Sequence, residues 1–429
     1  MADSSKVYKQ LGYLKEDLKS VLITNLGKEF DQPIKLKING EAEITRRYRK
    51  NELAVKLSTD IYVDRTWSDS SYVIKKKKPF SDRNVYLNRR IGLALYEIFN
   101  EEFERIKNHL HTAELVPESR RKIPLFLKPM AINSDELKRN NLSLTKFSGR
   151  IPLDEALEEL REEENCTAEH LLPSLDQYAL LFDRVPLLLE PIMKRKEKNY
   201  PVLSEIKRLE HKINANGEYI SDYTKGFSKL VDLGLSYVDK TMREDLKGNL
   251  NFLVNVTLAS DLETLIQADA YPWHNNNLHL FDNGNICYGS RGLTLGALFG
   301  HPDVYLKMEN PKNEIETLIN RNYASRSRAI SLQFHTPKSN IDFQLLTKSF
   351  YVGAVCANAN LLTEYELKGE DPGNIMTAIE SQLKTLGEDY GLAPAKEMAE
   401  ILSKLYIKGN LLKMPKKNWY EILKENLGL

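Results

Sequence analysis

The segment PIKLKINGEAEITRRYRKNELAVKLSTDIYV, Pro33 to Val63, alternates apolar and polar residues along much of its length. Such alternation is typical of β-strands that turn one face to a core and the other to solvent. The pair Asn39-Gly40 supplies residues that readily adopt positive φ, so it predicts a tight turn between Ile38 and Ala42. We therefore expect a small antiparallel meander in this part of the chain.

Apolar residues at helical spacing flank this segment on both sides. Residues 6–26 carry one apolar stripe, which predicts an amphipathic first helix. Residues 84–110 carry a second stripe, and Asp82 stands where it can cap the start of that helix. A helix, a meander and a further helix together predict an α+β domain.

The rest of the chain is richer in helical patterns. Residues 152–247 combine such patterns with Pro and Gly punctuation, whereas NLNFLVNVTLAS, residues 249–260, returns to a strand-like alternation. Helices are expected again at 312–322, 342–364 and 372–408. The fold class predicted for the whole chain is α+β. Its three expected parts are a helix, meander and helix domain over 1–112, a mostly helical region over 113–247, and a mixed region over 248–429 with a β-hairpin.

Composition and charge narrow the function classes. The chain has 429 residues, with 61 basic and 60 acidic side chains and a net charge of +1. This balance argues against nucleic-acid binding over the whole surface and leaves room for a local basic patch. No apolar run reaches the roughly 20 residues that a membrane span needs. The first 20 residues lack the apolar core of a secretory signal. We expect a cytoplasmic or virion-associated protein that is not secreted by a signal peptide and has no membrane contact.

A second segment, NNLHLFDNGNICYGSRG, Asn276 to Gly292, contains one of the three cysteines. Short alternating runs flank Asn283-Gly284, which predicts a β-hairpin with these two residues at its tip. Cys287 then lies near the end of the second strand. Two interpretations stay open: a reactive thiol presented by the hairpin, or a small apolar side chain packed beneath it.

The residues LHLFDNGNICYGS, Leu278 to Ser290, resemble the active-site segment of prokaryotic ubiquitin-conjugating-enzyme-like proteins of the PRTRC type. The resemblance implies that Cys287 carries a thioester to the C-terminus of a ubiquitin-like protein. It also implies that His279, eight residues earlier, stabilises the developing oxyanion. That fold has a four-stranded meander ahead of the cysteine. Here the helix over 6–26 and the meander over 33–63 would form its front half, with residues 80–245 inserted.

Basic residues gather in two short runs. RRYRK contributes Arg46, Arg47 and Arg49, and KKKK contributes the four residues Lys75, Lys76, Lys77 and Lys78. These side chains suit contacts with phosphate groups or with an acidic partner. The alternative is a solvated edge that discourages strand-to-strand aggregation.

Common enzyme motifs are missing from the sequence, including the P-loop, Gly-x-Gly-x-x-Gly, Gly-x-Ser-x-Gly and His-Glu-x-x-His. We expect no cofactor and no metal site, and the sequence leaves open whether the protein is an enzyme. The function it favours is a structural or interaction protein of a phage or mobile element. Such a protein would contact other proteins, copies of itself included, or nucleic acid through the local basic patch. The alternative is an acyl carrier of the ubiquitin-conjugating type that uses Cys287.

Overall fold

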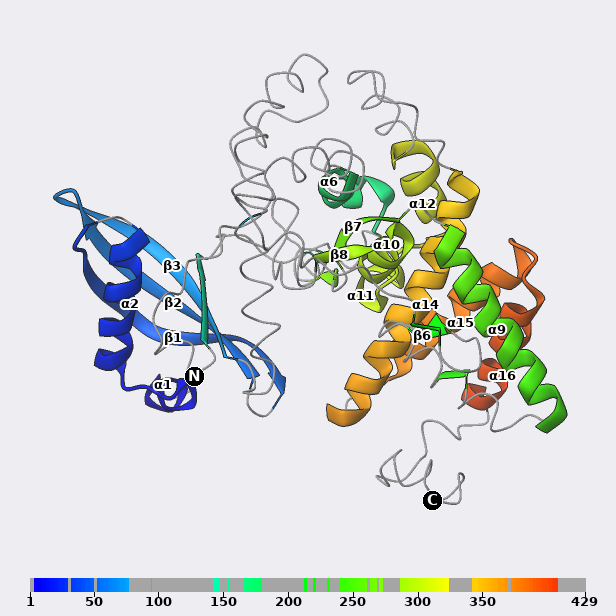
Figure 1. The fold of residues 1–429 in the computed structure, drawn as a ribbon, viewed down its shortest axis with the longest axis horizontal. Helices are drawn as coiled ribbons and strands as arrows, with labels where there is room; N and C mark the ends of the chain where they lie inside the picture. The colour runs from blue at the N-terminus through cyan, green and yellow to red at the C-terminus, as the bar shows by residue number, and fades with distance from the viewer. Residues whose placement is uncertain are drawn as a thin grey trace, which may run out of the picture. The chain divides into compact units, whose positions relative to one another are not determined.

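The structure, a computed structural model, divides into two compact units. Unit 1 comprises residues 1–151, 196–205 and 279–286, and unit 2 comprises residues 152–195, 206–278 and 287–429. Both units contain helices and strands (Figure 1), which confirms the α+β class. The three-part division expected from the sequence stays a prediction. The residues that the structure describes are 4–29, 32–49, 52–76, 94, 142–146, 153, 157, 166–179, 212–213, 219–220, 230–231, 240–260, 263–267, 270–272, 286–323, 342–368 and 372–407.

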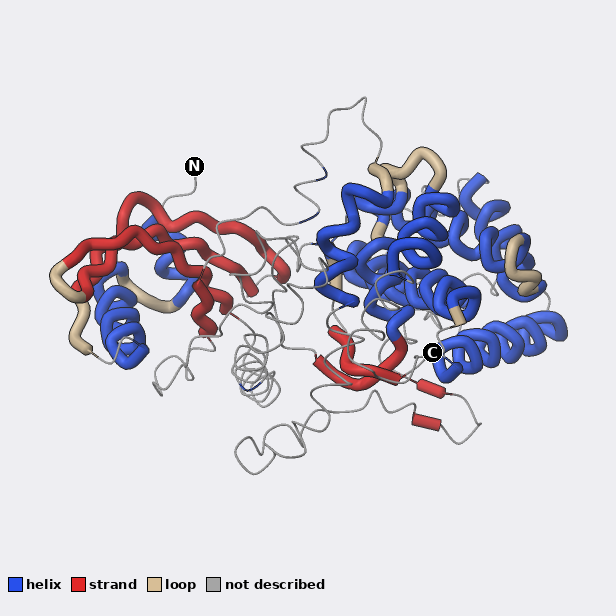
Figure 2. Tube along the Cα trace, turned by 90° about the horizontal axis from the view of Figure 1, so that it is seen from above, coloured by secondary structure: helices blue, strands red, loops and turns tan. Residues whose placement is uncertain are grey.

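Unit 1 is built on an antiparallel sheet with the strand order β1-β2-β3-β4, and two helices cover one face of it. The predicted meander is confirmed by β1 to β3. Alternate residues of these strands, among them Leu36, Leu57 and Ile74, join the helices in one apolar core. Figure 2 shows the strands in red and the helices in blue. The elements are α1 (Ser4–Leu11), α2 (Lys15–Glu29), β1 (Lys35–Arg49), β2 (Glu52–Val63), β3 (Thr66–Lys76) and β4 (Leu142–Lys146).

The turn predicted at Asn39-Gly40 is wrong, because β1 continues through it. Asn39 pairs with Ser58, and the register then shifts before Glu43 pairs with Lys56. The Asn39 side chain donates a hydrogen bond of 2.6 Å to Asp60 of β2. This asparagine therefore joins two paired strands and does not form a turn. The chain reverses between Arg49 and Glu52 instead, which pair with each other.

The first predicted helix, over 6–26, is two helices. Gly12, with φ of 88°, ends α1. The amide of Gly12 donates to the Lys9 carbonyl, and the amide of Tyr13 donates to the Tyr8 carbonyl. This pair of bonds is the Schellman arrangement, which satisfies carbonyls at a helix C-terminus. Because the apolar stripe in the sequence continues across Gly12, it did not indicate that the helix ends there.

Unit 2 is mainly helical. The helices expected near 342–364 and 372–408 are present, and the second is divided around Gly391, which has φ of 67°. The helix expected at 312–322 is present as α12 followed by a π-helical turn. The elements are α6 (Ala168–Ala179), β5 (Lys212–Ile213), β6 (Tyr219–Ile220), α9 (Lys240–Ser260), β7 (Glu263–Gln267), β8 (Ile286–Ser290), α10 (Arg291–Phe299), α11 (Pro302–Tyr305), α12 (Pro311–Glu316), η7 (Thr317–Tyr323), α14 (Phe343–Lys368), α15 (Gly373–Glu388) and α16 (Ala393–Ile407).

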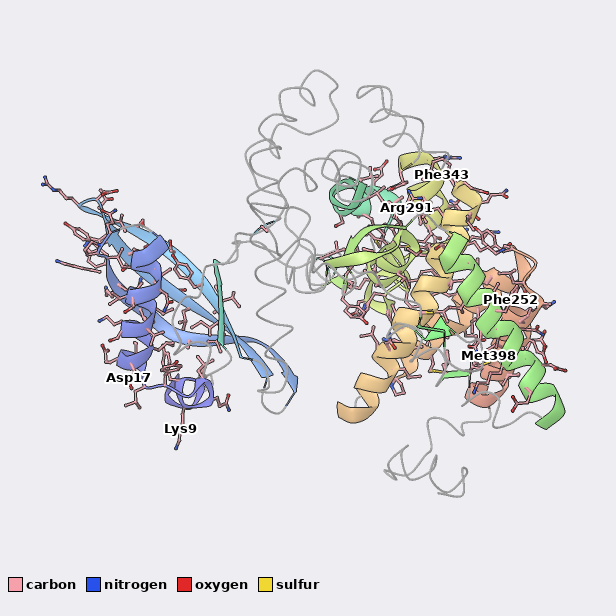
Figure 3. The ribbon with its side chains drawn as sticks, viewed as in Figure 1. Lys9, Asp17, Phe252, Arg291, Phe343 and Met398 are labelled. Carbon is pink, nitrogen blue, oxygen red and sulfur yellow. The ribbon has the colours of Figure 1, made fainter. Side chains whose placement is uncertain are left out.

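The strand expected at 249–260 is wrong, because these residues form the second half of α9. Among the α9 side chains that the structure describes, the buried ones are Leu246, Leu250, Val254 and Thr257, a spacing of four, four and three. Phe252 lies between them on the exposed side and is 69% exposed (Figure 3). The core therefore follows the helical period and not the alternation of the sequence.

Two further predictions lie largely outside the described residues. Of the helix expected at 84–110, only Ala94 is described, and it is helical. Of the hairpin at 276–292, the second strand is present as β8, and its described partner strand is β7. None of the helices in the described part of the chain combines the length and the apolar character needed to cross a membrane.

Candidate functional site

The basic residues of β1 and β3 lie at the same end of the sheet. Ala54 of β2 pairs with Arg46 on one side and with Lys75 on the other. Leu53 pairs in the same way with Arg47 and Lys76. We call the five residues Arg46, Arg47, Arg49, Lys75 and Lys76 the basic end.

Register, not sequence proximity, brings these positions together. Neighbouring strands lie about 4.8 Å apart, so backbones that flank one shared β2 residue are about 10 Å apart. Lys75 and Lys76 pair on their other side with Ser143 and Leu142 of β4. Among the residues that pair with one another at this end of the sheet, Glu52, the partner of Arg49, is the one acidic residue. Lys77 and Lys78 lie outside the described residues. Basic positions gathered at one end of a sheet attract anions, so this end suits an anionic partner.

The predicted pairing of Cys287 with His279 stays a prediction. Cys287 lies in β8, three residues before Ser290, the last residue of that strand. The structure describes the backbone of Cys287. His279 lies outside the described residues. Whether the Cys287 thiol is reactive or packed therefore stays a prediction.

The other two cysteines are buried in unit 2 and free. Burial raises the pKa of the Cys166 thiol to about 11. It raises the pKa of the Cys356 thiol to about 12. Because the thiolate is the nucleophile, neither thiol is suited to chemistry at neutral pH.

A buried polar set stands where β8 meets α10. Ser290 caps α10 by accepting a hydrogen bond of 3.2 Å from the Gly292 amide. Its Oγ is also 2.9 Å from the Ser349 Oγ of α14. Arg291, labelled in Figure 3, donates from Nη1 to the Tyr323 Oη at 3.4 Å. Each of these side chains is less than 5% exposed, so they join elements in the interior and do not face a solvent-borne ligand.

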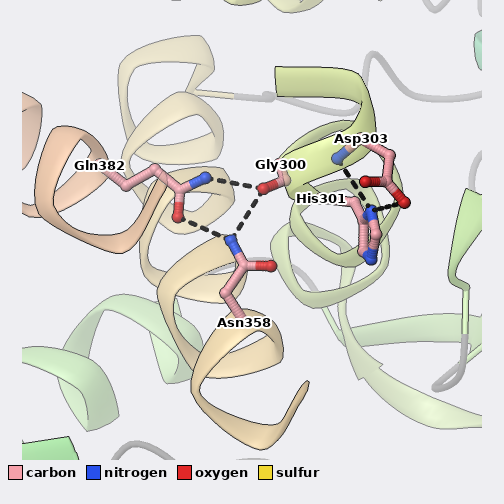
Figure 4. Close-up of polar contacts among 5 residues, drawn as sticks. All are labelled: Gly300, His301, Asp303, Asn358 and Gln382. Carbon is pink, nitrogen blue, oxygen red and sulfur yellow. Dashed lines mark hydrogen bonds and ion pairs between the residues drawn. The ribbon is translucent and has the colours of Figure 1, made fainter. Parts of the chain in front are cut away.

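A second buried set fixes the end of α10 (Figure 4). Asn358 of α14 and Gln382 of α15 each donate a hydrogen bond of 2.8 Å to the Gly300 carbonyl. Asn358 also donates to the Gln382 Oε1 at 3.1 Å. The next residue, His301, accepts at Nδ1 from the Asp303 amide at 3.2 Å, which begins α11. Because that nitrogen accepts, the nearby Asp303 carboxylate, 3.5 Å away, is not paired with a protonated Nδ1.

Sequence reasoning missed these buried sets because their members come from distant parts of the chain. One signal was available, the spacing of Gly292, Gly296 and Gly300 along α10. Small residues four apart line one side of a helix and allow a second backbone to approach closely. Within the described residues, no group of three or more His, Cys, Asp or Glu side chains is placed to hold a metal ion.

Comparisons with known proteins give solved structures only. No family model and no curated protein matches the chain. An ethanolamine kinase from Plasmodium vivax is similar with a TM-score of 0.44 and 11% identity, covering 86% of this chain and 88% of that one. A choline kinase from Cryptosporidium parvum Iowa II is similar with a TM-score of 0.45 and 10% identity, covering 90% of this chain and 99% of that one. At these low scores the likeness carries no argument for the activity of this chain.

The resemblance to ubiquitin-conjugating enzymes expected from Leu278–Ser290 is wrong: the two solved structures named above are kinases. The phage or mobile-element structural function and its acyl-carrier alternative are wrong with it. The fold gives a physical reason for the first correction. The resemblance implies that the meander and the cysteine segment belong to one fold, whereas β8 pairs with β7 in a two-stranded sheet that is separate from the sheet of β1 to β4.

Proposed function

We propose that unit 1 binds a phosphate-bearing polymer, a nucleic acid, through the basic end. The observation that carries this proposal is the register that aligns Arg46 with Lys75 and Arg47 with Lys76 across β2. Arginine and lysine contact phosphate oxygens with charge-assisted hydrogen bonds. Two runs that are separate in the sequence thus meet at one end of the sheet, with Arg46 and Lys75 in one row and Arg47 and Lys76 in the next.

The overall charge of +1 is compatible with this proposal, because the attraction is local. Charges on the same surface are screened beyond roughly 8 to 10 Å at physiological salt. A phosphate at the basic end would therefore respond to these cations and only weakly to acidic residues elsewhere. An intracellular location forms part of the proposal, in keeping with the free thiols of Cys166 and Cys356.

The test compares two double variants with a matched control. Arg46→Gln with Arg47→Gln, and Lys75→Gln with Lys76→Gln, each remove two charges from the basic end. Lys9→Gln with Lys15→Gln removes two charges from exposed positions on α1 and α2 of the same unit. Binding to a labelled single-stranded oligonucleotide is measured by fluorescence anisotropy over a range of salt concentrations.

We expect both basic-end variants to bind more weakly than the control. The slope of log K against log salt should become shallower by about 0.7 for each phosphate of the single strand that the variant no longer neutralises. If the basic-end variants bind like the control, or if the wild-type protein does not bind at low salt, the proposal is wrong. Binding of an acidic protein in place of the oligonucleotide would assign the basic end to a protein partner.

A further inference from the structure

At the far end of β2 from the basic end, three side chains form one row across the sheet. Tyr62 of β2 pairs with Lys35 of β1 and with Trp67 of β3. The Tyr62 and Trp67 ring centroids are 5.2 Å apart with their planes tilted by 51°. The Lys35 Nζ lies 5.4 Å from the Tyr62 ring centroid. We call these three residues the aromatic row.

The aromatic row is on the face of the sheet that does not carry the apolar core. Ile61, one residue before Tyr62, is buried in that core, and successive residues of a strand point to opposite faces. Trp67 is 55% exposed, although a tryptophan side chain gains more than most from burial. The turn that follows Tyr62 places Asp64 and Arg65 at φ of 50° and 64°, and this tight two-residue turn fixes Trp67 opposite Tyr62.

Both cations and carboxylates stand near the aromatic row. Asp60 accepts a hydrogen bond from Asn39 at 2.6 Å and lies 3.9 Å from the Lys37 Nζ. Asp64 accepts a hydrogen bond of 3.1 Å from Gln32. Lys37 offsets part of the Asp60 charge, whereas neither Lys35 nor Arg65 has an ion-pair partner among the described residues.

Asp69 lies beside Asp60 in the ladder and pairs with it. A hydrogen bond with Asp60, and then the charge of Asp60, raise the pKa of the Asp69 carboxyl. Lys35 is the cation next to the rings, and Arg65 stands in the turn that joins their two strands.

We propose that the aromatic row stacks an unpaired nucleobase and that its ligand is single-stranded nucleic acid. Aromatic rings accept any base through its π-face, and neighbouring cations hold the backbone phosphates. In a duplex the base faces are already stacked and are not offered to a protein side chain. The inference deepens the proposed function and rests on it for the second contact, at the basic end.

The distance between the two contacts indicates a polymer and not a single nucleotide. Ala54 and Tyr62 are eight residues apart along β2, or about 26 Å at the rise of a β-strand. Small single-strand-binding modules typically occupy about 4 to 16 nucleotides, a length that suits such a span. A mononucleotide can occupy the aromatic row but does not reach the basic end as well.

The test uses Trp67→Ala and Trp67→Phe, with Phe252→Ala of unit 2 as a control that removes another exposed aromatic ring. Affinity for a single-stranded 12-mer should fall by roughly 5- to 150-fold in Trp67→Ala, the range that corresponds to one base-stacking interaction. Trp67→Phe should keep most of the affinity, and Phe252→Ala should keep all of it. The slope of log K against log salt should stay the same in all three variants, because none of them removes a cation.

A second measurement, of tryptophan fluorescence, uses the wild-type protein. The 12-mer should quench tryptophan emission of the wild-type protein, and the quenching should be largely absent in Trp67→Phe. Unchanged affinity in Trp67→Ala together with no Trp67-dependent quenching would overturn the inference, as would equal affinity for duplex and single strand. If the basic-end variants bind like wild type while Trp67→Ala binds weakly, the proposed function fails and the stacking site stands. The reverse pattern removes the stacking site alone.

Discussion

At the scale of single residues, the buried hydroxyl of Tyr351 lowers the stability of unit 2. The side chain is fully enclosed, packed edge-on against Phe350 at 5.1 Å between ring centroids. Its Oη has no hydrogen-bond partner among the described residues. Desolvation by this burial is the main reason that the pKa of Tyr351 is raised. A polar atom held in this way forfeits its bonds to water without replacement.

Tyr351→Phe should therefore raise the free energy of unfolding by about 1 kcal/mol, because an unsatisfied buried group costs roughly 1 to 3 kcal/mol. Tyr305→Phe is the matched control, since the Tyr305 Oη is 3.3 Å from the Ser381 Oγ. It should lower the free energy of unfolding by about 0.5 to 1.5 kcal/mol. Urea denaturation followed by circular dichroism measures both. Equal destabilisation by the two variants would mean that the Tyr351 hydroxyl has a partner, such as a bound water.

At the scale of elements, the contact between α10 and α14 depends on glycine. A Cβ placed on Gly296 would lie 2.6 Å from the Phe350 carbonyl oxygen, and one on Gly292 would lie 2.5 Å from the Ser349 carbonyl oxygen. Both distances are shorter than real Cβ contacts allow, and the obstructing atoms are backbone. The two helices can approach to this distance only because these positions lack a side chain.

Gly296→Ala should lower the free energy of unfolding by about 1 to 3 kcal/mol, the usual cost of overpacking a core. Gly248→Ala is the control within another helix of unit 2, α9, where a Cβ would meet nothing within 4 Å. There the same change should stabilise the protein by about 0.5 to 1 kcal/mol, because alanine favours the helical backbone. Thermal and urea denaturation of the two variants give the comparison. A Gly296→Ala protein at least as stable as the wild type would show that α10 and α14 can separate without loss of stability.

Elements were predictable from the sequence where one periodicity stood alone. The apolar spacing of α14, α15 and α16 indicated helices correctly. In α9, Leu250, Phe252 and Val254 alternate in the sequence although Phe252 faces solvent, so a strand was predicted in place of a helix. Asn39-Gly40 has turn chemistry, but the pairing of β1 with β2 and the bond from Asn39 to Asp60 override it. Tertiary interactions outweighed local preference in that case.

The candidate sites depend still more on tertiary structure. The sequence supplied Arg46 and Lys75 as members of basic runs, but only the shared partner Ala54 places them side by side on the sheet. The aromatic row requires the register of three strands and the two-residue turn at Asp64-Arg65. Ser290 and Ser349 meet although 59 residues separate them. No single-sequence pattern encodes such long-range pairing.

At the scale of the whole molecule, the two units differ in chemistry. Unit 1 contains the basic end and the aromatic row but no cysteine, whereas Cys166, Cys287 and Cys356 all belong to unit 2. A thiol reagent therefore reports on unit 2 alone. This separation allows the state of unit 2 to be followed while unit 1 is occupied by a nucleic acid.

Thiol labelling should distinguish the three cysteines. In the folded protein at pH 8, Cys166 and Cys356 should not react, because both are buried and their pKa values are raised to about 11 and about 12, which leaves almost no thiolate. Labelling with an aromatic disulfide reagent should therefore modify at most one thiol, and mass spectrometry of the digested protein should assign it to Cys287. Denaturant should release all three. A count of one in the folded protein would show that Cys287 is accessible, and a count of zero would show that it is packed. Rapid modification of Cys356 would contradict the burial of α14, because that thiol is reached only when α14 separates from the helices around it.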